Sequence, residues 1–274
     1  MRPEVRATAI VSIVIIASFA AIALLHIHPL GTTIIKTFNS QLNSSLIYVY
    51  SNGLVGNLTI TSYSGNILKL IEVKHVVLCP PNYVASSIDS KQGSVELRFS
   101  TNNQFYWWPS WLCSVKFIVL VPRQRLIKLI SVNGTNGLID IHGATASFIR
   151  IKLVNGLGLL ESINATDIQV SIVNGVIIMN NTNVSNANVA VTNGVINSPL
   201  PIVQWYSLSV INGVVNMVTP INASISATIN NGKLIMIQPG NRRVLAGSIQ
   251  VVEGSVKPIV IISVVNGVAT INES

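Results

Sequence analysis

Acidic side chains in the second half of the chain are the first residues to test for chemistry, because glycosidic hydrolysis needs two carboxyl groups about 5–10 Å apart. Asp140 and Glu161 are separated by little more than the repeat length described below, so they could lie on neighbouring coils. Two surface carboxylates near the end of a stack explain the spacing equally simply, and we prefer that interpretation. The other carboxylates of this half are Asp167, Glu253 and Glu273.

The remaining reactive residue types form no catalytic or metal-binding pattern. His75 and His142 are far apart in the sequence, and neither has ligands at the spacing that zinc sites use. His26 and His28 flank an apolar segment. No glycine-rich phosphate loop, Cys-X-X-Cys or Gly-X-Ser-X-Gly motif is present. We therefore expect no enzyme activity, no metal and no cofactor.

An aromatic cluster is the strongest binding candidate. Such a cluster could stack on sugar rings or on a partner surface. It could equally be a plug that covers the apolar end of a stack of coils, and we weigh that interpretation higher. Its members are Phe105, Tyr106, Trp107, Trp108 and Trp111.

The only two cysteines, Cys79 and Cys113, are candidates for one disulfide. Closing the loop between them would stabilise the fold by about 3–4 kcal/mol in the chain-entropy model. Two buried thiols are the alternative. The disulfide is favoured only because the topology below places this region outside the cell.

Asn-Gly pairs recur every 19 residues in the second half of the chain, and a fixed period indicates a repeat architecture. Before each glycine, apolar residues alternate with polar ones, as in Ile168, Val170 and Ile172, which predicts a half-buried strand. A second apolar run follows each glycine. The repeated turn glycines are Gly137, Gly156, Gly175, Gly194, Gly213 and Gly232.

These patterns predict an all-β fold, a β-solenoid resembling a parallel β-helix with 19-residue coils. Asn-Gly between two strands is also a strong hairpin signal, so an antiparallel meander is the rival. A meander gives no reason for a strict period, whereas stacked coils place every inward residue on its own copy. The asparagines expected to form a hydrogen-bonded column are Asn155, Asn174, Asn193, Asn212 and Asn231. The period ends after Gly232, and the next Asn-Gly is at Gly267.

The chain before the repeats is expected to contain a leading β domain or irregular first coils over residues 45–131, with the solenoid repeats at 132–274. Strand-like runs occur at 45–50, 56–63, 67–78, 95–100 and 115–121. Residues 28–44 resemble a tether.

Residues 7–27 carry no charge and are long enough for a membrane-spanning helix. Arg2 and Arg6, in a basic head of residues 1–6, favour a cytoplasmic N-terminus, so the body would lie outside the cell membrane. A cleaved signal peptide is the alternative. The membrane lipid is thus an expected partner. The glycosylation candidates in Asn-X-Ser/Thr motifs are Asn43, Asn57, Asn133, Asn164, Asn180, Asn183, Asn222 and Asn272.

Charge composition argues against nucleic-acid binding. The formal net charge is +8, but only 9% of residues are charged and the cations are spread out rather than gathered in a patch. The stretch from Ile168 to Gly232 has no charged residue at all. Nearly half of the residues are apolar, which also argues against intrinsic disorder.

Residues 119–141 resemble the "putative adhesin" family of repeat-built β proteins of bacteria and archaea. The similarity rests on Val121-Pro122, on the strand from Leu126 to Leu129, and on Asn136-Gly137-Leu138-Ile139. It extends over roughly residues 45–270. The resemblance implies a β-solenoid-like fold and association with the cell surface or envelope, and it carries over no catalytic residues because the family has no settled function.

Together these features predict a membrane-anchored, extracellular, glycosylated protein with an adhesin-like structural or interaction role. Its expected partners are a glycan or another cell-surface protein. A subunit of an extracellular filament or envelope layer, which would self-associate, is one alternative. A polysaccharide-active β-helix enzyme is the other.

Overall fold

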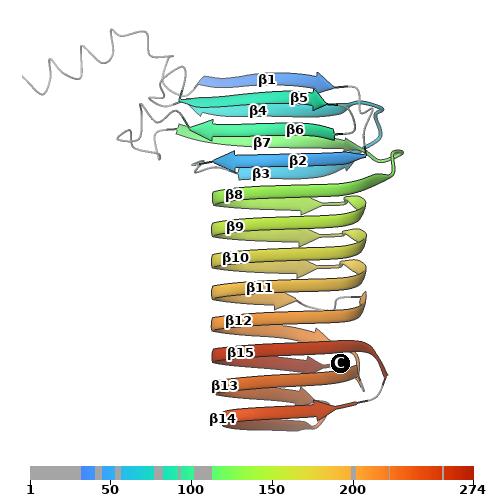
Figure 1. Cartoon of the computed structure of the whole chain (residues 1–274), viewed down its shortest axis with the longest axis vertical. Coiled ribbons are helices and arrows are strands. Elements are labelled where there is room, and N and C mark those ends of the chain that lie inside the picture. The colour runs from blue at the N-terminus through green and yellow to red at the C-terminus, as the bar shows by residue number, and fades with distance from the viewer. Residues whose placement is uncertain are drawn as a thin grey trace, which may run out of the picture.

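The computed structural model describes residues 32–40, 45–52, 57–76, 83–91, 94–101, 113–198, 202–221, 223–254 and 256–274. These residues form one open 15-stranded sheet and no helix, so the all-β prediction is confirmed (Figure 1). Seven shorter strands come first: β1 (Thr32–Ser40), β2 (Leu46–Asn52), β3 (Asn57–Tyr63), β4 (Leu68–Val76), β5 (Val84–Lys91), β6 (Ser94–Thr101) and β7 (Cys113–Pro122). Eight longer strands follow: β8 (Ile127–His142), β9 (Thr145–Glu161), β10 (Asn164–Asn180), β11 (Asn183–Ser198), β12 (Ile202–Thr219), β13 (Ala223–Gln238), β14 (Asn241–Glu253) and β15 (Val256–Glu273).

Strands β8 to β12 stack in parallel, each pairing with the next along the chain. Asn155 pairs with Asn174 and Asn174 with Asn193, so each residue meets its own copy 19 positions later. This register is solenoid-like. The antiparallel meander is therefore wrong for these strands. The period is strict because each residue stacks on its own copy in the next coil.

Each of these long strands bends once, at its Asn-Gly pair, into a first arm and a second arm. We call the bend the corner. In β10, the first arm buries Ile168, Val170 and Ile172, and the second arm buries Ile177 and Met179. The two sets face each other, and every coil repeats them one rung further on. The apolar core is thus a set of columns that run along the stack between the arms.

Glycine is required at the corner for two reasons. At Gly194 the backbone φ is 149°, which L side chains rarely adopt. A Cβ added there would also overlap the carbonyl oxygen of Gly175, one rung away. The same two conditions hold at Gly156, Gly175, Gly213, Gly232 and Gly267.

The corner asparagines form the predicted hydrogen-bonded column. The Asn174 Nδ2 donates to Asn155 Oδ1 at 2.8 Å, and the Asn193 Nδ2 donates to Asn174 Oδ1 at 2.7 Å. The direction is the same along the column, so every amide donates to the rung before it. Two members were not in the predicted set: Asn136 begins the column and Asn266 stands between Asn212 and Asn231.

The return turn between coils has its own repeated conformation. Gly143, Ser162 and Asn181 occupy equivalent positions and have φ values of 60°, 54° and 47°. This left-handed conformation suits glycine, and asparagine tolerates it. The Asn181 Nδ2 donates to Ser162 Oγ at 3.3 Å, so a short polar contact links these turns.

A pair of hydrogen-bonded hydroxyl groups lies inside the core of the coils. Tyr206 is fully buried in the column that holds Ala187 one rung earlier, and its hydroxyl lies 2.6 Å from Ser198 Oγ. Ser198 takes an inward position of the second arm that Met179 fills in the coil before. Burial raises the pKa of the Tyr206 phenol, so the hydroxyl stays protonated and can donate to Ser198.

The C-terminal strand does not continue the stack. β15 inserts between β12 and β13 and is parallel to both, and β14 folds back antiparallel on the outer edge of β13 (Figure 1). Gly267 therefore pairs with Gly213 on one side and Gly232 on the other. The Asn-Gly that ended the period in the sequence takes its place in the corner column.

The leading strands are part of the same sheet. β2 pairs with the first arm of β8 and β3 with its second arm, both in parallel. β6 pairs with β2, and β7 with β3. All five strand-like runs expected here are strands; β5 and β1 are additional, and β1 lies within the segment that resembled a tether.

The apolar segment at 7–27 lies outside the described residues. Within the part of the chain that the structure describes, no helix has the length and hydropathy needed to cross a membrane.

Candidate interaction face

The outward side chains of the first arms form continuous rows along the stack, because the parallel register repeats each position on the next rung. One row runs across β6, β2, β8 and β9 through Arg98, Tyr50, Asn133 and Lys152. The next row runs through Glu96, Tyr48, Ser131 and Arg150, of which Ser131 is buried between its neighbours. We call this outward surface the first-arm face.

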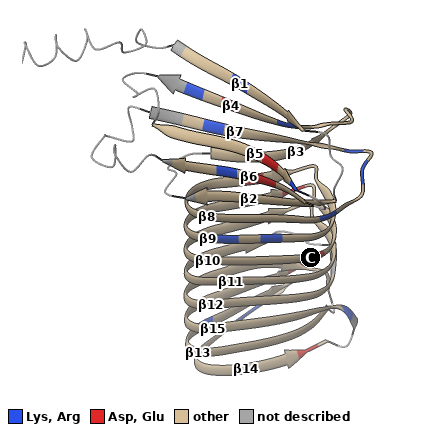
Figure 2. Ribbon diagram, turned by 45° about the horizontal axis from the view of Figure 1, so that its top comes forward, with Lys and Arg blue, Asp and Glu red and all other residues tan. Residues whose placement is uncertain are grey.

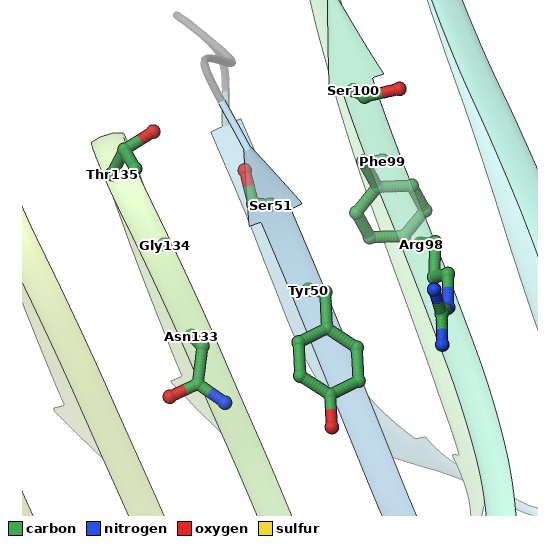
Figure 3. A pocket seen from close by; sticks show the side chains of 8 residues that line it. All are labelled: Tyr50, Ser51, Arg98, Phe99, Ser100, Asn133, Gly134 and Thr135. Atoms are coloured by element: carbon green, nitrogen blue, oxygen red, sulfur yellow. The ribbon is translucent and has the colours of Figure 1, made fainter.

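A hollow of this face lies where β6, β2 and β8 meet, and it has a volume of about 690 Å³. Figure 3 shows Asn133, Tyr50 and Arg98 side by side on the three strands, with their side chains extending in the same direction. The Arg98 guanidinium lies 5.6 Å from the centre of the Tyr50 ring, within cation–π range. The Tyr50 ring is in turn stacked near Tyr48, with 6.4 Å between centroids.

An ion-pair network holds the edge of this hollow. The Arg98 guanidinium donates to Glu96 Oε2 at 2.7 Å, and the Lys91 ammonium donates to the same oxygen at 3.1 Å. Hydrogen bonds from Arg98 and then Lys91 lower the pKa of Glu96, and the bond to Glu96 raises the pKa of Arg98. Arg98 is therefore oriented as a fixed cation beside an aromatic ring.

The hollow carries groups that can take part in binding. Its lining residues are Tyr50, Ser51, Arg98, Phe99, Ser100, Asn133, Gly134 and Thr135, with one cation and no carboxylate. Among the described residues no group of three or more His, Cys, Asp and Glu side chains is placed to hold a metal ion. A cation, a phenol ring and an amide can recognise a polar or ring-shaped group without acid–base chemistry.

Asp140 and Glu161 do lie on neighbouring coils, on the second arms. Glu161 pairs in register with His142, and the His142 Nδ1 is 3.5 Å from Asp140 Oδ1. His142, which had no ligand-spaced partner in the sequence, thus lies beside both carboxylates. The His142 side chain is 42% exposed and that of Asp140 27%, so this group is open to solvent.

The other acidic residues make ordinary structural contacts. Asp167 accepts a hydrogen bond from Asn186 on the next coil. Glu253 forms an ion pair with Arg243 in β14, and Glu273 accepts a hydrogen bond from Gln238 at 3.0 Å. Glu273 is buried, and all three carboxylates have a partner within the fold.

Several predicted sites fall outside the described residues. These are the whole aromatic cluster at 105–111, Cys79, and the acceptors Asn43 and Asn222. Among the remaining sequons, Asn57, Asn164, Asn183 and Asn272 are exposed, whereas Asn133 and Asn180 are half-buried.

Sequence reasoning missed the residues of the first-arm face. Tyr50 and Arg98 precede the repeats, so no period marked them, and only the pairing of β6 with β2 brings them together. The alternation of the repeats identifies inward positions, whereas Tyr50 and Arg98 occupy outward ones.

The sequence matches no family model and no curated protein. Solved structures do resemble the fold. The crystal structure of a "putative adhesin" from Bacteroides fragilis has a TM-score of 0.52 and 15% identity, covering 90% of this chain and 100% of its own. That of a "putative cell adhesion protein" from Clostridium sporogenes has a TM-score of 0.41 and 14% identity, covering 89% of this chain and 100% of its own. The chain shares the all-β fold of the Bacteroides fragilis protein.

Proposed function

We propose that this chain is a membrane-anchored, extracytoplasmic, adhesin-like interaction protein that works by binding and carries no catalytic centre. The first-arm face is the observation that carries the proposal. It presents cations, tyrosines and amides in rows along the stack, at the end formed by the leading strands. The fold shared with the Bacteroides fragilis "putative adhesin" supports the same role.

The proposed extracellular location rests on the sequence rather than on the fold. The basic head and uncharged segment support a body outside the cell, where exposed sequons such as Asn57 and Asn164 can be glycosylated and the two cysteines can be oxidised. The coils from β10 to β12 carry almost no charge, and Figure 2 shows little blue or red along them. Such a polar but uncharged surface suits a protein that meets other surfaces outside the cell.

The direct test has two parts, both in the native cell. Protease added to intact cells should cleave the body, and intact-mass analysis of the membrane fraction should give a mass above 29.4 kDa from attached glycans. Cells without the chain should lose attachment to a partner-cell layer, and the wild-type chain should restore it. A Tyr50→Ala/Arg98→Ala variant should fail to restore it. A protected, cytoplasmic body would overturn the proposal.

A matched control separates loss of the face from loss of folding. Val176→Ala changes a half-buried outward residue of the second arm of β10 and leaves the first-arm face intact. Cells carrying this variant should attach as well as the wild type.

A filament subunit is a second candidate, and the open sheet favours it. β1 and β14 stand at the two ends of the strand order, and each pairs with a single neighbour among the described strands. Such edges can pair with another chain, head to tail. Arg242 and Arg243 on β14 act against this pairing. Filaments in electron micrographs of cell-surface material, absent after Val244→Pro in β14, would support this candidate over a monomeric adhesin.

A further inference from the structure

A second groove lies on the first-arm face further from the leading strands, where it crosses β9, β10, β11 and β12. It has a volume of about 350 Å³. Its outermost row contains one residue from each of β9, β10, β11 and β12, and these four residues pair in register from strand to strand. They are Phe148, Asp167, Asn186 and Trp205. Each of these residues lies 19 positions after the one before it, so the row repeats with the coil on its outward side.

Aromatic rings close both ends of this row. Phe148 and Trp205 are three rungs apart, or about 14 Å at the usual spacing of paired strands. Trp205 is 37% exposed although it is a large apolar side chain. The Arg150 guanidinium lies 5.2 Å from the centre of the Phe148 ring, which holds that ring in place.

The floor between the rings is made of polar side chains that are already held by hydrogen bonds. The Arg150 Nε donates to Gln169 Oε1 at 3.0 Å, and the Asn186 Nδ2 donates to Asp167 Oδ1 at 2.8 Å. Asn188 completes the lining. Each of these groups keeps further donor or acceptor capacity for a ligand. Because the side chains are fixed beforehand, little conformational entropy is lost on binding.

We propose that this groove binds an unbranched, neutral oligosaccharide that runs parallel to the stack. The two rings would pack on sugar faces, and the amides between them would bond to hydroxyl groups. Adjacent rungs are about 4.8 Å apart, close to the length of one pyranose in an extended chain, so one sugar would lie over each rung. This inference rests on the proposed interaction function and names the class of its ligand.

Charge and backbone pairing favour a neutral glycan over other ligands. The only charged residues in the groove are Arg150 and Asp167, which have opposite signs and are both hydrogen-bonded to neighbours. A polyanion would therefore meet no net positive charge. The floor is a sheet face whose backbone N–H and C=O groups pair between rungs, whereas extended peptides are bound at sheet edges.

The test uses the full-length chain in detergent micelles and immobilised linear hexasaccharides of glucose, xylose, mannose and N-acetylglucosamine. The wild type should bind at least one of them with a dissociation constant that is unchanged by salt up to physiological strength. Trp205→Ala and Phe148→Ala should each weaken that binding about tenfold. Ile211→Ala is the matched control, because Ile211 is an exposed apolar residue of β12 outside the groove. It should bind within twofold of the wild type.

Three outcomes would overturn the inference: no binding to any of the four sugars, equal binding by all variants, or an equal loss with Ile211→Ala. A bound protein partner that is released by the Trp205→Ala change, without sugar binding, would do the same and identify a protein ligand. The result is separable from the cell-surface test. Attachment that survives Trp205→Ala leaves the adhesin-like function standing, and sugar binding by a body that proves cytoplasmic leaves the groove standing.

Discussion

The regular coils and the leading strands both bury apolar residues between two arms, but the two regions join their arms differently. In β8 to β12 one Asn-Gly pair bends every strand, and each corner is hydrogen-bonded to the corner before it. In the rung made of β2 and β3, and in the rung made of β6 and β7, the two arms are separate strands. Segments 53–56 and 102–112 join them and lie outside the described residues.

The inward faces of the two regions are nevertheless alike. The leading rungs bury Val49 and Leu97 in line with the first-arm columns, and Phe99 packs on Phe117 across the core with 4.0 Å between ring centres. Apolar columns therefore suffice to stack rungs, and the repeated corner adds register and regularity. The ends of the stack differ again, because the pairs there are antiparallel: β1 with β4, β4 with β7, β5 with β6, and β13 with β14.

The largest effect is expected from substituting a corner glycine. Gly194→Ala should destabilise the fold by more than about 3 kcal/mol, because the left-handed backbone and the contact with the Gly175 carbonyl leave no room for a methyl group. Urea unfolding followed by circular dichroism measures this. Gly158→Ala is the control, since its methyl would meet no backbone atom but only the flexible side-chain tips of Ile177 and Ile172. Equal losses in the two variants would contradict the special role of the corner.

A smaller effect is expected inside the core. Tyr206→Phe should cost about 2 kcal/mol, because it leaves the buried Ser198 hydroxyl without its tyrosine partner. Adding Ser198→Ala to that variant should recover part of the loss. A double-mutant cycle of unfolding free energies checks this, and additive losses would show that the two hydroxyl groups are not coupled.

The asparagine column should contribute less per residue because it is exposed. Asn193→Ala removes two ladder bonds, one to Asn174 and one from Asn212, and should cost about 1 kcal/mol. Asn136→Ala, at the start of the column, removes only the bond from Asn155 and should cost about half as much. The measurement is the loss of unfolding free energy in each variant relative to the wild type, and the ratio of the two losses decides the prediction. Equal costs would mean that the ladder bonds do not add.

The smallest effect is expected in the leading strands, at Glu96. Its pKa is lowered in the folded chain, so its ionised form stabilises the fold above its ordinary pKa and loses that contribution as the pH falls through the lowered value. Glu96→Gln should therefore be slightly less stable than the wild type at pH 7 and equally stable at pH 2. A gap that persists at pH 2 would assign the loss to packing rather than charge.

Much of the coil stack could be predicted because its signals are local and repeated. The alternation at Ile168, Val170 and Ile172 identifies the buried face, and the period of the Asn-Gly pairs selects parallel stacking over hairpins. The first-arm face could not be predicted in the same way. Tyr50 and Arg98 are 48 positions apart, and no period relates them. Their contact depends on the pairing of β6 with β2, although β3, β4 and β5 lie between these two strands in the chain.

The sequence by itself determined the all-β class, the 19-residue coil and the Asn-Gly corner, because each follows from side-chain alternation and from a backbone conformation that glycine alone adopts easily. Only the tertiary structure decided where the last strand goes. Asn266-Gly267 carries the corner motif, but its distance along the chain breaks the period. The inward residues Val260, Ile262 and Val264 fit any rung, so pairing between β12 and β13, with β14 folded outward, fixes their place.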